Sequence, residues 1–442
     1  MQQQWQLPRR THQEKKGAYI NARLYDPDTG LDTHGALLTI GDKIADFGNN
    51  IFKDNIPDDV EVIDCKGHLL APGLIDMQVH FREPGQTHKE TIGTGSKSAV
   101  SGGITTVVCQ PNTEPTIDNV EIVELIKART MDTSYLNILV YAAITKKRDG
   151  QELTDMGKLV EAGVVGFTDD GGPVMNPLLM RRALSYSSMF GVPIAQHAED
   201  LYLTQGGCIN EGDISFKLGV TGIPNISESV MVERDLAILG ITGGHYHVLH
   251  VSTKESLKAI KRAKQEGLNV TCEVAPHHFL LTDEAVLQHN SYAKMNPPLR
   301  SEADRLALIQ GLQEGVIDAI ATDHAPHNDA SKELPLSQAS FGIVGVETML
   351  PLSLELYHNG LISLQDVLAK MTYKPADILS IQSGRLKKGN QADLVLIDLN
   401  HEWIIDTNNF SSKSKNSPFN GRKVKGRAIK TVVCGEIVYS IA

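Results

Sequence analysis

Long hydrophobic runs are absent from this chain of 442 residues. No apolar segment approaches the length of about 18 residues that a membrane-spanning helix needs, so we expect no membrane span. An excess of positive charge is also absent: the net charge is −11 and the pI is about 5.8. Such a chain has no basic surface for nucleic acid or an anionic membrane. Residues 1–16 lack the apolar stretch of a secretory signal, and we interpret them as a mobile polar tail.

Cysteine is scarce as well. The five cysteines are Cys65, Cys109, Cys208, Cys272 and Cys434, and none belongs to a CxxC pair. An odd, scattered set argues against a disulfide framework. The reducing cytoplasm is therefore the expected compartment.

Short apolar runs rich in β-branched residues recur through the middle of the chain. There are eight: GLIDMQVH, ITTVVCQPN, LNILVYAAI, VVGFTDD, VPIAQHAED, HYHVLHVST, NVTCEVAPHH and IDAIATDHAPH. Helical patterns such as SLKAIKRAKQEG separate many of them, which predicts a parallel sheet covered by helices. Eight units predict an α/β fold, a (β/α)8 TIM-type barrel over residues 71–380. An open doubly wound sheet is disfavoured, because no Gly-rich nucleotide turn follows the first run.

Both ends of the chain have a different sequence pattern from the middle. Residues 17–70 and 381–442 contain short alternating strands separated by turn residues, for example AYINARLYD and IKTVVCGEIVYS. Neither end carries enough apolar surface to fold alone. We therefore expect the two ends to form one small β-sandwich beside the barrel.

Potential metal ligands collect at the ends of the predicted barrel strands. They are His80, Asp169 and Asp170, His197, His250 and Asp323. A barrel of this type builds its active site at the carboxyl ends of its strands. Imidazole and carboxylate groups together suit Zn²⁺, with Mn²⁺ or Co²⁺ as substitutes. The sequence therefore predicts a metal-dependent hydrolase.

Gln78 is an irregular feature of this set. Metal hydrolases often carry two histidines spaced His-x-His at such a strand end, and here the first position holds an amide. An amide oxygen is a weaker donor to zinc than a ring nitrogen. We therefore expect one tight zinc ion, and a second, weaker or partly occupied position beside Gln78.

Several longer motifs resemble dihydroorotases, in the cyclic amidohydrolase group of the amidohydrolase superfamily. They are HFREPG, QPNTEP, GFTDDG, HVSTKES, EVAPHH, NPPLR, ATDHAPH and FGIVGVET. TDDG resembles the type in which an aspartate bridges two zinc ions, and no lysine stands in VVGFTDDGG to be carbamylated instead. The resemblance implies that His80, Asp170 and Asp323 hold one ion and Asp170, His197 and His250 the other. The family's spacing to His197 favours Asp170 over Asp169 as the bridge.

The resemblance also implies a substrate and the residues that bind it. Metal-activated hydroxide would attack the ring amide of dihydroorotate, giving N-carbamoyl-L-aspartate, with Asp323 as general base and then acid; the reverse reaction serves pyrimidine biosynthesis. The implied substrate-binding residues are Arg82, Asn112, Asn296, His327, Phe341 and Gly342. The polar residues 328–340 are interpreted as a mobile lid.

Two other functions remain open at this point. One is a hydantoinase- or allantoinase-type cyclic amidase, and the other is a catalytically silent homologue that serves as a structural partner of aspartate carbamoyltransferase. The retained ligand residues argue against the silent homologue. The sequence leaves open both a homodimer and binding to aspartate carbamoyltransferase.

Overall fold

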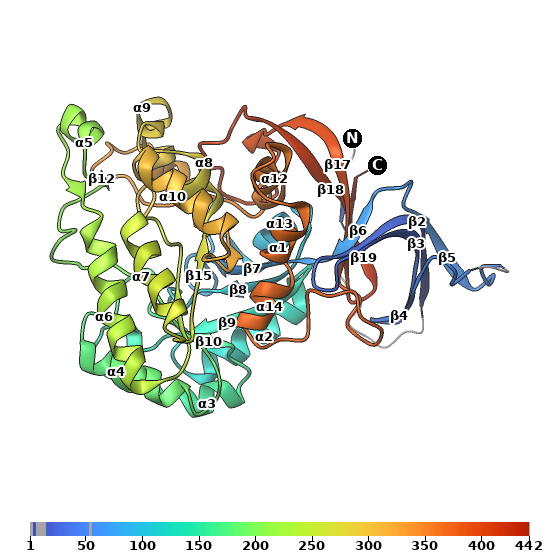
Figure 1. The fold of residues 1–442 in the computed structure, drawn as a ribbon, viewed down its shortest axis with the longest axis horizontal. Coiled ribbons are helices and arrows are strands. Elements are labelled where there is room, and N and C mark those ends of the chain that lie inside the picture. Colours follow the sequence, from blue (N-terminus) through green and yellow to red (C-terminus); the bar gives the residue numbers. More distant parts are fainter. Residues whose placement is uncertain (1–2, 6–14, 53–54, 442) are drawn as a thin grey trace.

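The computed structural model describes residues 3–5, 15–52 and 55–441. Eight parallel strands in the middle of the chain form a nearly closed barrel, which confirms the predicted fold class (Figure 1). The strands are β7 (Leu74–Val79), β8 (Ile104–Cys109), β9 (Asn137–Ala142), β10 (Gly166–Phe167), β11 (Ile194–Gln196), β14 (Tyr246–Val248), β15 (Val270–Val274) and β16 (Ala319–Ile320). Each strand lies within one of the eight predicted apolar runs.

The barrel closes between its first and last strands. Val79, at the end of β7, forms a parallel bridge with His324, which follows β16. The backbone N–H of His80 also donates to the carbonyl of His324 at 2.9 Å. Closure therefore brings the residues that follow β7 next to those that follow β16.

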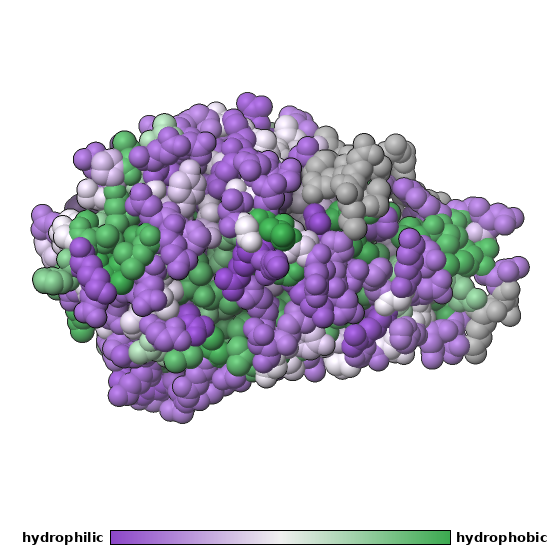
Figure 2. Space-filling view, turned by 90° about the horizontal axis from the view of Figure 1, so that it is seen from above, coloured by the Kyte–Doolittle hydropathy of each residue, from purple (hydrophilic) through white to green (hydrophobic). Residues whose placement is uncertain are grey.

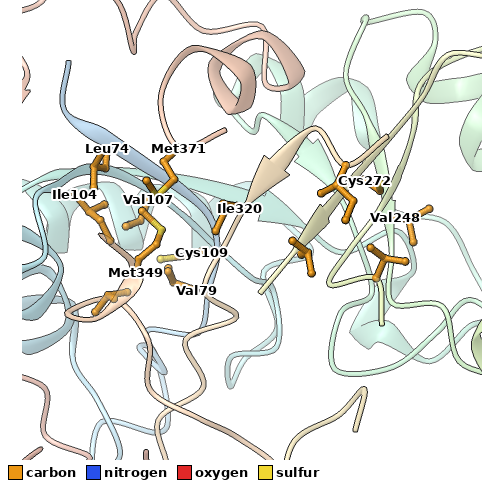
Figure 3. Packing of buried hydrophobic residues seen from close by; sticks show 14 of the residues in the cluster. Leu74, Val79, Ile104, Val107, Cys109, Val248, Cys272, Ile320, Met349 and Met371 are labelled. Atoms are coloured by element: carbon orange, nitrogen blue, oxygen red, sulfur yellow. The ribbon is translucent and has the colours of Figure 1, made fainter. Parts of the chain in front are cut away.

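The side chains of β8 alternate between two buried faces of the barrel wall, which explains why the barrel strands are rich in apolar residues. Val107 and Cys109 pack outward in the cluster that joins the strands to the surrounding helices, beside Met349 (Figure 3). Val108, between them, belongs to a separate cluster with Met77 of β7 inside the barrel. Successive side chains on a strand point to opposite faces, so a strand buried on both faces needs an unbroken apolar run.

Helices cover the outside of the barrel. They include α1 (Ile92–Ser101), α2 (Val120–Thr133), α3 (Met156–Glu161), α4 (Pro177–Ser187), α6 (Ile226–Thr242), α7 (Lys254–Gln265), α10 (Glu302–Gln313), α12 (Met349–His358), α13 (Leu364–Ala369) and α14 (Tyr373–Ile378). In α7, the Thr253 side chain accepts a hydrogen bond from the Ser256 N–H, which satisfies a free donor of the first turn. Leu257 and Ile260 of this helix are buried against the barrel.

Shorter helices and strands lie in the loops at the carboxyl ends of the barrel strands. They are β12 (Ile209–Asn210), β13 (Gly222–Ile223), α5 (Asp213–Leu218), α8 (Pro276–Leu280), α9 (Ala285–His289) and α11 (Asp329–Lys332). His277 and His278 lie in α8 rather than on a strand, because Pro276 begins a helix directly after β15. No helix in the described ranges is long and apolar enough to cross a membrane.

Both ends of the chain contribute to one mixed sheet beside the barrel (Figure 1). Its strands are β1 (Gln3–Trp5), β2 (Lys16–Asp26), β3 (Leu31–Ile40), β4 (Lys43–Gly48), β5 (Val60–Asp64), β6 (Leu69–Pro72), β17 (Leu394–Ile404), β18 (Lys423–Val433) and β19 (Glu436–Ile441). β6 joins the two ends, because it pairs with β2 on one side and β17 on the other. Leu37 and Leu394, from opposite ends of the chain, share one core cluster.

The prediction of a mobile tail over residues 1–16 is wrong at Lys16, which begins β2, and at Gln3–Trp5. Gln3–Trp5 form β1, which pairs antiparallel with β19 and so satisfies the backbone groups of that edge strand. Residues 1–2 and 6–14 of the predicted tail lie outside the described part of the chain. The face seen in Figure 2 is mainly hydrophilic, with separate hydrophobic patches.

Candidate metal centre

Five of the predicted site residues meet at the carboxyl end of the barrel. His80 follows β7, Asp170 follows β10, His197 follows β11, His250 follows β14 and Asp323 follows β16. All five are at most 6% exposed. They form two groups of three, within each of which the potential ligand atoms lie within 4.8 Å of one another.

The first group contains His80, Asp170 and Asp323. His80 Nε2 lies 3.0 Å from Asp323 Oδ1 and 3.3 Å from Asp170 Oδ2. The other ring nitrogen, Nδ1, donates to Asn112 Oδ1 at 2.8 Å. With the ring proton on Nδ1, the lone pair of Nε2 is free for a cation held between this nitrogen and the two carboxylates.

The second group contains Asp170, His197 and His250. Asp170 Oδ1 lies 3.4 Å from His197 Nδ1 and 3.6 Å from His250 Nε2. The two imidazoles approach each other to 2.9 Å between these nitrogens. Asp170 thus turns one carboxylate oxygen toward each group and is common to both.

Asp169 has a different environment from its neighbour. Its Oδ1 accepts from the Thr145 N–H at 3.0 Å and its Oδ2 from the Thr145 hydroxyl at 2.5 Å. Both carboxylate oxygens are therefore occupied by the loop after β9. The structure brings Asp170, not Asp169, into the two groups.

Gln78 lies beside the first group and is fully buried. Its Nε2 donates to Asp170 Oδ2 at 3.2 Å, and its Oε1 is buried with no hydrogen-bond partner. An amide carries a donor and an acceptor at nearly the same position, so half a turn of the group exchanges them. After such a half turn the oxygen, in place of Nε2, would lie beside Asp170 Oδ2 and be available to a cation.

Glu199 is a site residue that the sequence analysis missed. Its Oε2 accepts from His197 Nε2 at 2.8 Å and from Asn296 Nδ2 at 2.9 Å. The bond to His197 leaves Nδ1 of that ring facing Asp170, the arrangement in which a metal-ligating histidine donates its second N–H to a carboxylate. The spacing His-x-Glu directly after an apolar strand was the available signal.

Three residues at this end of the barrel adopt unusual backbone conformations. Arg82, His250 and Asp323 have φ values of 46°, 32° and 48°, in the left-handed region that side chains with a Cβ rarely adopt. Such conformations cost about 1–3 kcal/mol each and cluster at functional sites. Here they turn side chains that follow a strand inward over the end of the barrel.

Burial and close charges set the protonation of the groups. Burial would raise the pKa of Asp170, but hydrogen bonds from His197 and His250 hold that pKa well below its usual value. Burial would lower the pKa of His197, yet its bonds to Asp170 and Glu199 raise the pKa to about 10. The Glu199 pKa falls to about 2, because His197 outweighs the effect of burial. In the metal-free chain His197 is therefore an imidazolium between two carboxylates.

The predicted substrate residues adjoin the first group. Arg82 is 7% exposed, its Nε donates to the Pro326 carbonyl at 3.3 Å, and its Nη2 donates to His327 Nε2 at 3.2 Å. Burial lowers the pKa of Arg82 to about 10, which leaves it charged at neutral pH. Burial and the charge of Arg82 lower the pKa of His327 to about 2, so the neutral ring accepts this bond.

Phe341 and Gly342 directly follow residues 328–340, the segment interpreted as a lid. Lys332, within that segment, is fully buried and donates through Nζ to the carbonyls of Ser340 at 2.8 Å and Gly342 at 3.0 Å. Lys294 Nζ lies 4.3 Å from the centre of the Phe341 ring. Buried ammonium groups thus hold the C-terminal end of the segment.

Comparison with known proteins identifies the family. Residues 67–256 match a protein-family profile described as Dihydro-orotase-like. A dihydroorotase from Wolbachia sp. subsp. Drosophila simulans is 63% identical over 442 residues, which cover 100% of this chain and 99% of that protein. A dihydroorotase from Ehrlichia chaffeensis is 60% identical over 440 residues, covering 99% and 98%. The chain belongs to the dihydroorotase family.

Among solved structures, this dihydroorotase-family chain is similar to hydantoinases. An L-hydantoinase from Arthrobacter aurescens matches with a TM-score of 0.86 and 26% identity, covering 96% of this chain and 95% of the other. A dihydropyrimidinase from Brevibacillus agri matches with a TM-score of 0.83 and 22% identity over the same shares. The resemblance to dihydroorotases drawn from the motifs is confirmed, and the 22% match shows a shared fold alone.

Proposed function

We propose that this chain is a zinc-dependent dihydroorotase. It would hydrolyse (S)-dihydroorotate reversibly to N-carbamoyl-L-aspartate, in de novo pyrimidine biosynthesis. The observation that carries the proposal is the position of Asp170, which turns one carboxylate oxygen to each of two buried ligand groups in a chain of this family. High identity to dihydroorotases, rather than to the hydantoinases that share the fold, supports the substrate.

The ligand groups fit zinc ions by their chemistry. Each contains imidazole and carboxylate donors, all buried, and catalytic zinc sites commonly use three protein ligands. His80, Asp170 and Asp323 would hold one ion, and Asp170, His197 and His250 the other. Zinc, when bound, polarises a carbonyl oxygen and lowers the pKa of water toward neutrality, which supplies a nucleophile.

Asp323 is the proposed acid and base of the reaction. Its left-handed backbone turns the carboxylate over the barrel, with Oδ1 3.0 Å from His80 Nε2. In hydrolysis it would take the proton of the attacking water and pass it to the departing ring nitrogen. Ring closure would use the same group in the opposite order.

Arg82 is the proposed partner of the substrate carboxylate. A buried guanidinium offers a planar fork to a carboxylate. Its bonds to His327 and the Pro326 carbonyl fix its orientation. His327 and Asn112 would complete the anion site, while Asn296, Phe341 and Gly342 would contact the ring.

Glu199 is a proposed positioning residue. It accepts from both His197 and Asn296, and so joins a proposed zinc ligand to a proposed ring contact. Fixing the second nitrogen of a ligating histidine orients the ring and raises its basicity.

Turnover of a substrate panel tests the proposal. Purified chain with its zinc content measured should hydrolyse dihydroorotate and act weakly on hydantoin and allantoin. Asp323→Asn should lose most turnover in both directions. Hydantoin hydrolysis that exceeds dihydroorotate hydrolysis would contradict the substrate assignment.

Further proposals concern partners and compartment. A homodimer is supported by exposed aromatic residues after β11, since Tyr202 is 85% and Phe216 88% exposed. Sedimentation of the chain alone, and with an aspartate carbamoyltransferase, tests both associations. A cytoplasmic location is supported by Cys65, Cys109, Cys208 and Cys272, which are free, buried thiols.

A further inference from the structure

Asn416 lies outside the barrel in sequence, between β17 and β18, yet its side chain reaches the substrate end of the barrel. It is fully buried. Its Nδ2 donates to the carbonyls of Ala325 and Gly342, each at 3.0 Å. Its Oδ1 accepts from the His327 N–H at 3.1 Å. One amide group thus uses three of its hydrogen-bonding positions on two short stretches of chain.

Those two stretches are the ends of the segment 328–340. Ala325 and His327 lie before the segment, and Gly342 lies just after it. The Ala325 N–H donates to the Ile343 carbonyl at 2.9 Å, so the two stretches already lie side by side. Asn416 bridges the same pair and also accepts the Val344 N–H at its backbone carbonyl at 2.9 Å. It therefore fixes the spacing between the two ends.

The contact around Gly342 leaves little tolerance for movement. A Cβ at this glycine would lie 2.5 Å from the Ala325 carbonyl oxygen and 2.6 Å from His327 Cδ2. The Gly342 carbonyl accepts from Lys332 Nζ as well as from Asn416. A small shift of this carbonyl would displace the His327 ring, which accepts from Arg82.

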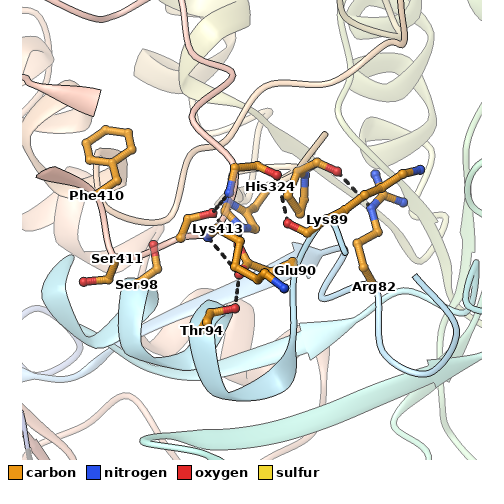
Figure 4. A network of polar contacts seen from close by, with 12 residues as sticks. Arg82, Lys89, Glu90, Thr94, Ser98, His324, Phe410, Ser411 and Lys413 are labelled. Carbon is orange, nitrogen blue, oxygen red and sulfur yellow. Dashed lines mark hydrogen bonds and ion pairs between the residues drawn. The ribbon is translucent and has the colours of Figure 1, made fainter. Parts of the chain in front are cut away.

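The segment that carries Asn416 is itself anchored to the barrel. Figure 4 shows Lys413 of this segment beside Glu90 and His324, and Ser411 beside Ser98 of α1. The Ser411 N–H donates to Glu347 Oε1 at 2.6 Å, and the Lys413 N–H donates to Glu90 Oε1 at 3.2 Å. The side chain of Asn416 is therefore presented from a fixed position.

We propose that Asn416 is a positioning residue for substrate binding. It holds His327 and Gly342 in register, and through His327 it orients the guanidinium of Arg82. The roles of these partners rest on the proposed function. The hydrogen bonds of Asn416 described above go to Ala325, His327, Gly342 and Val344, none of which belongs to a ligand group. The inference therefore predicts an effect on substrate binding without an effect on metal content.

Asn416→Ala and Asn416→Asp test this, with Asn420→Ala as a matched control. Asp keeps the acceptor for the His327 N–H and loses the donor. Asn420 lies in the same segment, where its Oδ1 accepts from the Thr407 N–H at 3.0 Å, away from the substrate residues. Misplacing a binding group by about 1 Å can lower activity by about 100-fold. Both Asn416 variants should therefore raise KM for dihydroorotate by about 10–100-fold, with kcat changed less and zinc per chain unchanged. Asn420→Ala should match the natural chain.

Hydrogen–deuterium exchange supplies a readout that does not depend on substrate. The amides of His327 and Val344 should exchange faster in Asn416→Ala than in the natural chain, since the first loses its acceptor and the second its fixed partner. Natural KM with natural exchange in both variants would overturn the inference, as would a fall in kcat and zinc content with KM unchanged. If the natural chain does not turn over dihydroorotate, the proposed function fails. Exchange at the two amides then decides the positioning role by itself.

Discussion

Gln78→His tests whether the amide beside the first ligand group weakens metal binding there. In the natural chain Gln78 Nε2 donates to Asp170 Oδ2 at 3.2 Å. For its oxygen to face a cation, the amide has to rotate by half a turn and give up this bond to a buried carboxylate. A hydrogen bond to a charged group contributes about 1.5–3 kcal/mol. An imidazole at this position presents a ring nitrogen without that loss.

The expected magnitude follows from this bond. Since about 1.4 kcal/mol corresponds to a tenfold change in affinity, Gln78→His should tighten zinc at the His80, Asp170 and Asp323 position by about 10–100-fold. The Asp170, His197 and His250 position should keep its affinity, apart from any change transmitted through Asp170. The natural chain should accordingly show two unequal zinc affinities.

Competition titration with a chromophoric chelator measures both affinities, and elemental analysis after dialysis measures what is retained. Gln110→His is a matched control, because Gln110 is also a buried glutamine at a strand end. Its Nε2 donates to the Met77 carbonyl at 3.2 Å and not to a carboxylate of a ligand group. Two equally tight zinc ions in the natural chain, unchanged by Gln78→His, would show that the amide is an adequate ligand and refute the reasoning.

Four further predictions concern charge, positioning, pH and metal removal. Arg82→Ala should lower kcat/KM for dihydroorotate by about 2–4 kcal/mol, as for a charged partner lost from a buried site; an equal loss on a neutral cyclic amide would make Arg82 structural. Glu199→Gln should weaken zinc binding by about 10–100-fold, as for other residues that orient a ligating histidine, measured by the same titration; unchanged affinity would remove Glu199 from the site. The third follows from the pKa of His197, about 10 in the metal-free chain. Zinc must displace this proton, so affinity should rise about tenfold per pH unit between about pH 7 and 9, and a pH-independent affinity would contradict the imidazolium. Chelator-treated chain should lose activity and regain it with zinc, and full activity without metal would exclude a metal enzyme.

Much of the fold follows from local pattern. β8 is buried on both faces, so its sequence, ITTVVC, is rich in β-branched residues and has no charged residue, a pattern that predicts a barrel strand. The potential ligands that follow the strands could also be predicted, because the carboxyl ends of barrel strands meet at one face. The sequence alone does not show that β10 and β16 are only two residues long in the structure.

Other features depend on contacts that no local pattern encodes. His and Asp adopt left-handed conformations more often than most residues. The local sequence does not say which of them do so, and His250 and Asp323 are selected by tertiary structure. Asn416 stands in the polar stretch SSKSKNSPFNG, which reads as an ordinary loop. Its partners His327 and Ala325 lie 89 and 91 residues away along the chain. Helical or strand periodicity carries no information over such separations.

Closure of the barrel between β7 and β16 has a consequence for the order of folding. His80 and Asp323, in the first ligand group, are separated by 243 residues and meet only when the last strand joins the first. Asp170 and His250, in the second group, are separated by 250 − 170 = 80 residues and belong to one side of the barrel. Contacts between distant residues form late, because closing a long loop costs more entropy. We expect a refolding chain to bind zinc at Asp170, His197 and His250 earlier than at His80, Asp170 and Asp323. Activity should therefore return later than the earlier of the two zinc-binding steps. Simultaneous return of both binding steps in a refolding time course would contradict this order.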